Sequence, residues 1–259
     1  MLIGGFHGLI LLSLQTIMAN DFFKFRQFTI SQQRCAMKVG TDGTLLGAWA
    51  RTSCQGDSEK SRILDIGTGT GLIALMMAQR YPNAVIKAID VDENAVCQAR
   101  ENVSVSPFST RIEVIQADIA LFESDESFDA IVCNPPYFTA ANSMESPDFQ
   151  RRIARQTHSL DFKMLVNTVK RLLAPKGLFS VVIPTDGYGL MANEAMLADL
   201  YVSRLCRVRT TPRKVPKRVL IEFSKLPVDE VDITDGVIEI QPNIRSSWYQ
   251  ELTQDFYII

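Results

Sequence analysis

The stretch RILDIGTGTGLIALMMAQRY (62–81) sets the fold class of this chain. Its first five residues form an apolar run typical of a buried strand, and residues 71–81 carry apolar side chains at helical spacing. Between them stand Gly67, Gly69 and Gly71. Glycines at a strand-to-helix turn allow a tight loop and let a ligand approach the backbone closely. The stretch predicts a strand–glycine loop–helix unit, although a simple tight turn would explain the glycines equally well.

The same alternation of strand and helix continues along the chain. We expect further strands at 84–90, 111–118, 128–134, 178–184, 202–210 and 218–225, and helices at 92–103, 159–173 and 187–200. Apolar strands that alternate with helices are typical of a mainly parallel sheet covered by helices on both faces. The link 211–217 is too short for a parallel crossover, so the last strand should be antiparallel. The prediction is an α/β fold with a seven-stranded, mainly parallel sheet.

Composition bounds the class of protein. The 259 residues are 46% hydrophobic and 22% charged, with a net charge of −2, which is typical of one globular domain and excludes dominant disorder. Five cysteines form no CxxC pair, and only two histidines are present. We therefore expect neither a disulfide framework nor a metal site, and a reducing, cytoplasmic location.

The first twenty residues differ from the rest because they carry no Lys, Arg, Asp or Glu. A signal peptide needs a basic start, and a membrane-spanning helix needs about 20 mostly apolar residues without the glycines and polar residues found here. Two interpretations stay open: an apolar extension, or a misassigned start with translation beginning at Met18. We favour the second, and expect residues 21–259 to form a single domain with no membrane association.

Acidic residues end the next two strands of the predicted sheet. Asp90 lies 19 residues after Gly71, where a carboxylate can bind both hydroxyls of a ribose. Asp118 ends the following strand and can accept a hydrogen bond from the exocyclic amine of an adenine. Asp65 is either structural or a support for these acids. Ligands of open α/β sheets bind at the carboxyl ends of strands, so these features converge on one cleft. Leu72 stands where a nicotinamide-binding fingerprint needs glycine, which argues against an oxidoreductase.

The sequence Asn-Pro-Pro-Tyr (134–137) follows the fourth strand. A conjugated amine is a poor nucleophile, but the Asn134 side-chain oxygen and the Pro135 carbonyl could accept both of its N–H groups and orient its lone pair toward a methyl group. Pro135 and Pro136 stiffen the loop, and Tyr137 offers a face on which a planar base can stack. A proline-rich turn would explain the motif alone, but its place in the strand order favours amine chemistry.

Together, DIGTGTG (65–71), Asp90, Asp118 and NPPY resemble the class I S-adenosylmethionine-dependent methyltransferases that act on planar nitrogen. The resemblance implies a Rossmann-like fold and S-adenosylmethionine as cofactor, bound by the loop glycines and by the three acids. Two more segments, residues 25–50 and QELTQDFY (250–257), look like the bacterial valine-tRNA adenine-37 N6-methyltransferase family. In that family the first segment closes one side of the cofactor pocket, which implies roles for Lys38, Thr41 and Asp42.

The net charge conceals a basic region. Residues 148–218 hold 14 basic and five acidic side chains, and seven of the basic ones fall within 204–218. Such a cluster can neutralise phosphates, although an isolated basic run is more often a solvated surface. Beside a cleft that handles a base, RNA binding is the better interpretation. The residues expected to contact RNA are Arg151, Arg152, Arg207, Arg209, Arg213, Lys214 and Lys217.

The family implies methylation of N6 of the adenine beside the anticodon of tRNA, and we expect the enzyme to act as a monomer. An anticodon-loop base is unpaired, so extruding it costs less than flipping a base from a duplex. A protein glutamine-N5 methyltransferase stays open as an alternative, as do DNA adenine-N6 and rRNA guanine-N2 methyltransferases. The basic region argues against the first. A non-catalytic RNA-binding module would need neither the cofactor acids nor NPPY.

Overall fold

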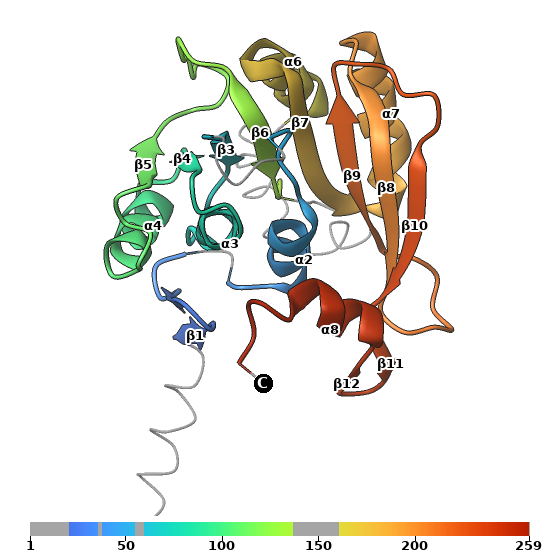
Figure 1. Ribbon diagram of the computed structural model, residues 1–259, viewed down its shortest axis with the longest axis horizontal. Coiled ribbons are helices and arrows are strands. Elements are labelled where there is room, and N and C mark those ends of the chain that lie inside the picture. Colours follow the sequence, from blue (N-terminus) through green and yellow to red (C-terminus); the bar gives the residue numbers. More distant parts are fainter. Residues whose placement is uncertain (1–20, 36–37, 55–59, 137–160, 259) are drawn as a thin grey trace, which may run out of the picture.

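The computed structural model describes residues 21–35, 38–54, 60–136 and 161–258. Its centre is an eight-stranded sheet in the order β10-β8-β9-β7-β6-β3-β4-β5 (Figure 1). The strands are β3 (Arg62–Ile66), β4 (Val85–Asp90), β5 (Ile112–Gln116), β6 (Phe128–Cys133), β7 (Leu173–Pro184), β8 (Tyr201–Arg209), β9 (Arg218–Ser224) and β10 (Asp232–Val237). Strand β9 runs antiparallel to its neighbours β7 and β8, and every other neighbouring pair is parallel.

The predicted fold class is confirmed, with one strand more than expected. All seven expected strands are present, and the strand at 218–224 is antiparallel as predicted. The eighth, β10, pairs in parallel with β8 at the edge of the sheet. Its sequence DITDGV has no apolar run, and its first four residues are exposed, so the pattern that reveals a buried strand is absent.

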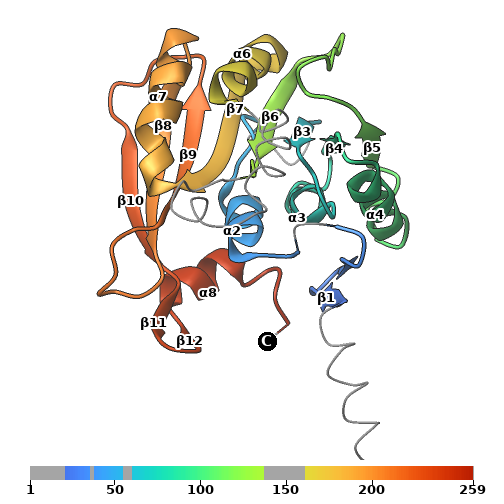
Figure 2. The ribbon, with the colours of Figure 1, turned by 180° about the vertical axis from the view of Figure 1, so that it is seen from behind.

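Helices cover both faces of the sheet. They are α2 (Thr41–Trp49), α3 (Leu72–Arg80), α4 (Glu93–Ser104), α6 (Phe162–Leu172), α7 (Tyr188–Leu197) and α8 (Ser247–Thr253). Alternate residues of each strand face opposite sides: Ile63 and Val132 pack with α2 and α3, whereas Leu64 and Ile131 pack with α6 and α7. The view from behind shows α6 and α7 on their own side of the sheet (Figure 2). The result is a three-layer α/β/α arrangement.

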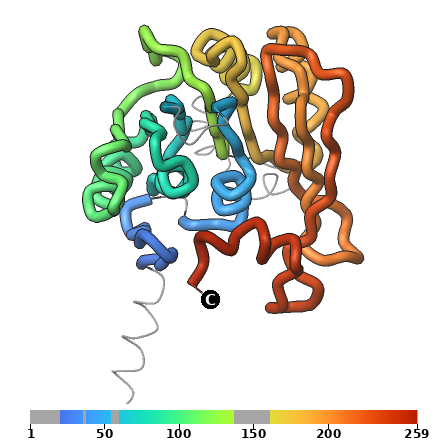
Figure 3. Tube along the Cα trace, in the orientation of Figure 1, coloured from blue at the N-terminus to red at the C-terminus, as the bar shows by residue number. Residues whose placement is uncertain are grey.

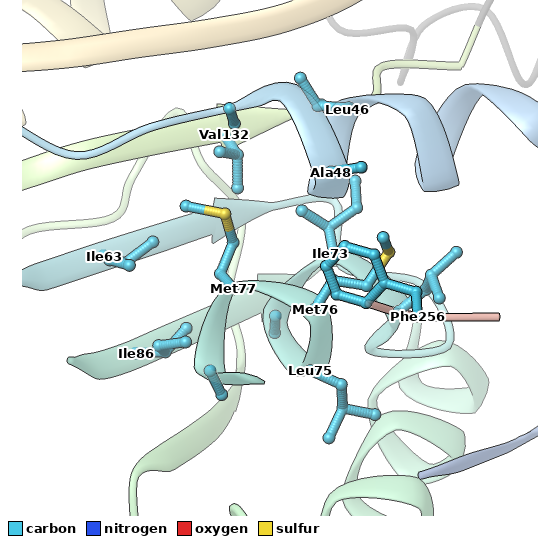
Figure 4. Close-up of a cluster of buried hydrophobic side chains, with 14 of the residues drawn as sticks. Leu46, Ala48, Ile63, Ile73, Leu75, Met76, Met77, Ile86, Val132 and Phe256 are labelled. Carbon is cyan, nitrogen blue, oxygen red and sulfur yellow. The ribbon is translucent and has the colours of Figure 1, made fainter. Parts of the chain in front are cut away.

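The segments near the two ends of the chain pack together on one face. Two short hairpins, β1 (Phe22–Lys24) with β2 (Thr29–Ser31) and β11 (Glu239–Gln241) with β12 (Ile244–Arg245), lie outside the main sheet. The traced chain brings the C-terminal segment beside α2 and α3 (Figure 3). Phe256 is 1% exposed and lies among Ile73 and Met76 of α3 (Figure 4), and its carbonyl accepts the N–H of Arg26 at 2.8 Å. Both terminal segments thus belong to the core that supports α2 and α3.

Among the helices that the structure describes, none has the length and apolar character needed to cross a bilayer.

Candidate functional site

The glycine loop after β3 forms the centre of the candidate site. Gly67, Gly69 and Gly71 have φ values of 68°, 55° and 82°, a left-handed conformation that side chains other than glycine adopt at a cost. A Cβ added to Gly67 or Gly69 would have no atom within 4 Å, so the space in front of the loop is open. The N–H groups of Gly67 and Thr68 donate to the Ile89 carbonyl at 2.9 and 3.0 Å. The loop is therefore fixed to β4 and leaves room for a ligand.

Asp90 lies directly beside this loop, at the carboxyl end of β4. Its carboxylate accepts the N–H of Gly69 at 2.9 Å and the N–H of Asp92 at 3.0 Å. Asp118 follows β5 and is exposed, and its Oδ1 accepts the Ala120 N–H at 2.9 Å. Because β3, β4 and β5 are neighbouring parallel strands, both acids and the loop share one edge of the sheet. The structure brings these sequence-predicted residues together.

Asp65 is fully buried beneath the loop. Its Oδ2 accepts the Thr68 hydroxyl at 2.7 Å and the Ala74 N–H at 3.1 Å, whereas its Oδ1 has no hydrogen-bond partner among the described residues. Burial raises the pKa of Asp65 to about 7, against the lowering effect of these two hydrogen bonds. A buried acceptor with an unused oxygen, next to an open glycine loop, fits a ligand that carries N–H donors or positive charge.

Asn134 leaves the sheet next to Gly67. Strand β6 is the neighbour of β3, and Ile66 pairs with Cys133, so the residues that follow them emerge side by side. Asn134 is half-buried, Pro135 is buried and Pro136 is exposed. Tyr137 lies outside the described residues. The amine-binding residues predicted from the sequence thus border the glycine loop, as methyl transfer between two bound molecules requires.

The segment 31–35 lies along α4, close to Asp90. The Asn102 side chain accepts the Ser31 N–H at 2.8 Å and donates to the carbonyls of Ser31 and Thr70, each at 2.9 Å. The Gln98 Oε1 accepts the Arg34 N–H at 3.2 Å. Burial raises the pKa of Cys35 to about 11, and the charges of Asp90 and Asp92 add to that rise. Residues 31–35 are therefore held against α4 by hydrogen bonds to two buried side chains.

Sequence reasoning missed Asn102 and Gln98. Both are polar, yet only 2% and 1% exposed, and they stand four residues apart on the face of α4 that also buries Ala95 and Ala99. Polar residues at helical spacing among small apolar ones are the signal that would have found them. Of the residues implied by the family resemblance, Lys38 is exposed, Thr41 begins α2, and Asp42 forms an ion pair with Arg218. Burial raises the pKa of Asp42, and Arg218 opposes that effect.

The basic residues of 204–218 divide into two groups. Four are paired with acids: Arg207 and Arg209 with Asp235 at 2.7 and 2.9 Å, Arg204 with the fully buried Glu222 at 3.2 Å, and Arg218 with Asp42. Within the described part of the chain, Arg213, Lys214 and Lys217 form no ion pair, and all three are exposed. Arg151 and Arg152 lie outside the described residues.

These three free cations lie on the connection between β8 and β9, residues 210–217, which we call the basic link. Arg218 pairs with Pro184 at the carboxyl end of β7. The Thr185 N–H donates to the Lys217 carbonyl at 3.2 Å, and its hydroxyl donates to the Pro216 carbonyl at 3.0 Å. Because β7 is parallel to β6, the basic link meets the sheet at the same edge as Asn134. In Figure 1 it is the orange loop at the lower right.

Comparison with known proteins shows which family this chain is similar to. Residues 53–187 match the model of the Methyltransferase small domain family. A protein of Phocaeicola vulgatus named tRNA1(Val) (adenine(37)-N6)-methyltransferase is 51% identical over 242 residues, which are 93% of this chain and 99% of the relative. A protein of the same name from Tolumonas auensis is 40% identical over 242 residues, covering 93% and 98%.

Solved structures share the fold at low sequence identity. A predicted O-methyltransferase from Agrobacterium tumefaciens superposes with a TM-score of 0.59 at 19% identity, covering 83% of this chain and 96% of that one. A putative class I S-adenosylmethionine-dependent methyltransferase from Listeria monocytogenes gives a TM-score of 0.53 at 13% identity, covering 82% and 65%. These likenesses identify the fold as that of class I methyltransferases.

Proposed function

The chain belongs to the tRNA1(Val) (adenine(37)-N6)-methyltransferase family, and from that premise we propose that it transfers a methyl group from S-adenosylmethionine to N6 of adenine 37 in a valine tRNA. The observation that carries the proposal is the side-by-side emergence of Gly67 and Asn134 from β3 and β6. A cofactor loop and an amine-binding residue that lie side by side can bring a methyl donor and its acceptor together. The basic link at the same edge favours a polyanionic substrate over a protein one.

The cofactor would lie against the open side of the glycine loop. S-adenosylmethionine, when bound, supplies an electrophilic methyl group. We assign ribose binding to Asp90 and contact with the adenine amine to Asp118, at the ends of two neighbouring strands. Gly67 and Gly69 leave space for the ligand, Gly71 leads the chain into α3, and the unused Oδ1 of Asp65 offers an acceptor beneath the loop. Lys38 and Thr41, from the N-terminal segment, would close one side of the pocket.

The target adenine would be held on the other side of the same edge. The Asn134 side-chain oxygen and the Pro135 carbonyl would accept the two N–H groups of N6 and orient its lone pair toward the methyl group. In the transfer the methyl–sulfur bond would break, the thioether would leave with its electron pair, and N6 would then release one proton to solvent. Tyr137, with Pro136 before it, supplies a stacking face. Arg213, Lys214 and Lys217 contact phosphates of the anticodon arm, together with Arg151 and Arg152. Arg207 and Arg209 contribute less, because Asp235 already neutralises part of their charge.

The test is methylation of unmodified valine tRNA with labelled S-adenosylmethionine, followed by digestion and identification of the labelled nucleoside. The expected product is N6-methyladenosine at position 37. A transcript with guanine at position 37 serves as the matched control and should accept no label. Label in protein would favour the glutamine-N5 activity instead, and labelled guanine would favour the guanine-N2 activity.

We also propose that the active form is a monomer in the cytoplasm, where tRNA is modified. Light scattering on the purified protein, with and without tRNA, measures the mass of the active species. A protein mass near 29.0 kDa is expected in the free state. A stable dimer at the concentration used in the methylation assay would contradict the monomer.

A further inference from the structure

The first turn of α2 is a junction of three elements. A Cβ placed on Gly43 would lie 3.2 Å from Leu72 Cδ2 and 3.9 Å from Asn134 Nδ2. Leu72 is the first residue of the helix that follows the glycine loop, and Asn134 begins the amine-binding motif. The absence of a side chain at Gly43 therefore lets α2 pack closely against Leu72, with Asn134 nearby. Any movement of this turn would disturb both residues.

Asp42, the preceding residue, connects this turn to a distant strand. Its carboxylate is ion-paired with the guanidinium of Arg218, and the two side chains are only 29% and 23% exposed. Arg218 is the first residue of β9 and directly follows the basic link. Partial burial strengthens the Coulomb attraction within such a pair but also removes both charges from water, and it makes the loss of one partner costly.

The basic link, which directly precedes Arg218, is also held in place. The basic link is held to residue 185 by two hydrogen bonds, through the carbonyls of Pro216 and Lys217. Arg218 directly follows Lys217 in the chain, and its side chain forms the ion pair with Asp42 of α2. Asn134 is thus a neighbour of Gly43, and Asp42, which precedes Gly43, is ion-paired with the residue that follows the basic link.

We propose that Asp42 and Arg218 are a positioning pair that fixes the position of the basic link relative to Asn134. With this spacing fixed, the link can bind a phosphate, and the motif a base, of the same RNA strand. This inference rests on the proposed function and adds two residues to it. It assigns Asp42 to substrate alignment, because Arg218 already occupies its carboxylate, and not primarily to the cofactor. Loss of either charge should weaken use of tRNA and leave cofactor binding nearly unchanged.

The test compares Arg218→Gln, Arg218→Lys and Asp42→Asn with a matched control, Arg62→Gln. Arg62 also begins a strand and is paired with an acid, Glu126 at 3.2 Å, but at the opposite edge of the sheet. For each variant the Kd for tRNA is measured by filter binding, the KM and kcat with valine tRNA by methylation, and the Kd for S-adenosylmethionine by calorimetry. Thermal melting reports whether each variant is folded.

Arg218→Gln and Asp42→Asn should each raise the Kd and KM for tRNA by about tenfold, equivalent to losing about 1.4 kcal/mol of alignment. The Kd for S-adenosylmethionine should stay within about twofold, and Arg218→Lys, which keeps a positive charge beside Asp42, should recover part of the loss. Equal losses in Arg218→Lys and Arg218→Gln, or a cofactor Kd that rises as much as that for tRNA, would overturn the proposal. Failure of the wild-type protein to methylate tRNA would refute the proposed function, and the tRNA Kd values would still decide this inference.

Discussion

The two sides of the cleft hold their charges in different ways. On the cofactor side, Asp65, Asp90 and Asp118 accept backbone N–H groups from residues 2 to 21 positions away, such as Gly69 and Ala120. On the RNA side, arginines pair with acids from other segments: Asp235 of β10 is 28 and 26 positions from Arg207 and Arg209, and Asp42 pairs with Arg218 across most of the chain. The first side depends on local backbone geometry and the second on tertiary pairing.

This difference determines how well a count of basic residues in the sequence can predict where RNA binds. A carboxylate that accepts N–H groups, as Asp90 does, still has lone pairs for a ligand. An arginine held by a carboxylate has lost most of its field, because the two charges cancel at the distance of a phosphate. Of the seven basic residues in 204–218, the three on the basic link form no ion pair with any residue that the structure describes.

The largest effect is expected where the two sides meet. Asn134→Ala removes an acceptor of the target amine, and loss of one oriented polar contact in a reacting site costs about 10²- to 10³-fold in kcat. The Kd for S-adenosylmethionine should change by less than about twofold, because Asn134 belongs to the target side. Single-turnover methylation and calorimetry measure the two quantities. Residual activity above one tenth of the wild-type level would contradict the assigned role.

On the cofactor side, loss of the Asp90 carboxylate should weaken the binding of S-adenosylmethionine. Asp90→Ala removes the acceptor beside Gly69 and the expected ribose ligand, and charged hydrogen bonds of this kind contribute about 1.5–3 kcal/mol. The Kd for S-adenosylmethionine should therefore rise about 10- to 100-fold. Asp92→Ala is the matched control, because Asp92 accepts the Asn94 N–H and caps α4. It should lower the melting temperature with little change in cofactor affinity.

The basic link should control tRNA affinity and its salt dependence. Reversal of both charges in Arg213→Glu/Lys214→Glu should weaken tRNA binding by at least about tenfold at low salt and reduce the slope of log Kd against log salt by about one to two. Lys60→Glu/Lys176→Glu makes the same change in net charge at exposed positions elsewhere. If both double variants lose affinity equally, net charge rather than the basic link determines binding.

The strands and helices of the central fold could be predicted because each carries a local pattern. β3 was predicted residue for residue, and the flanking helices to within three residues, since long apolar runs and helical periodicity dominate there. α2 lacks such a signal because it contains two glycines, which favour other conformations. A Cβ on Gly47 would lie 2.7 Å from Met76 Sδ, so close packing on α3 stabilises this helix where local propensity does not.

The candidate site divides in the same way. The glycine loop, Asp90 and Asn134 follow strands directly, so their common edge could be deduced from the strand order. Two sets of ion pairs could not be deduced: Asp235 with Arg207 and Arg209, and Asp42 with Arg218. Neither acid lies at a sequence spacing from its partner that would indicate a contact. β10 was itself unexpected, so nothing in the sequence indicated that its carboxylate would neutralise two arginines of the neighbouring strand.

The smallest effect is expected from releasing those two arginines. Asp235→Asn removes the acid that holds Arg207 and Arg209, and the ion pairs are 30–48% exposed, so the change should cost little stability. With their charges free at the edge of the sheet beside the basic link, the Kd for tRNA at low salt should fall by about two- to threefold, and the salt slope should increase. Glu126→Gln, which releases Arg62 at the opposite edge, is the matched control. Equal tightening by both variants would mean that the gain reflects net charge alone. Tightening confined to Asp235→Asn would place Arg207 and Arg209 within reach of the RNA, where Asp235 limits how strongly they bind it.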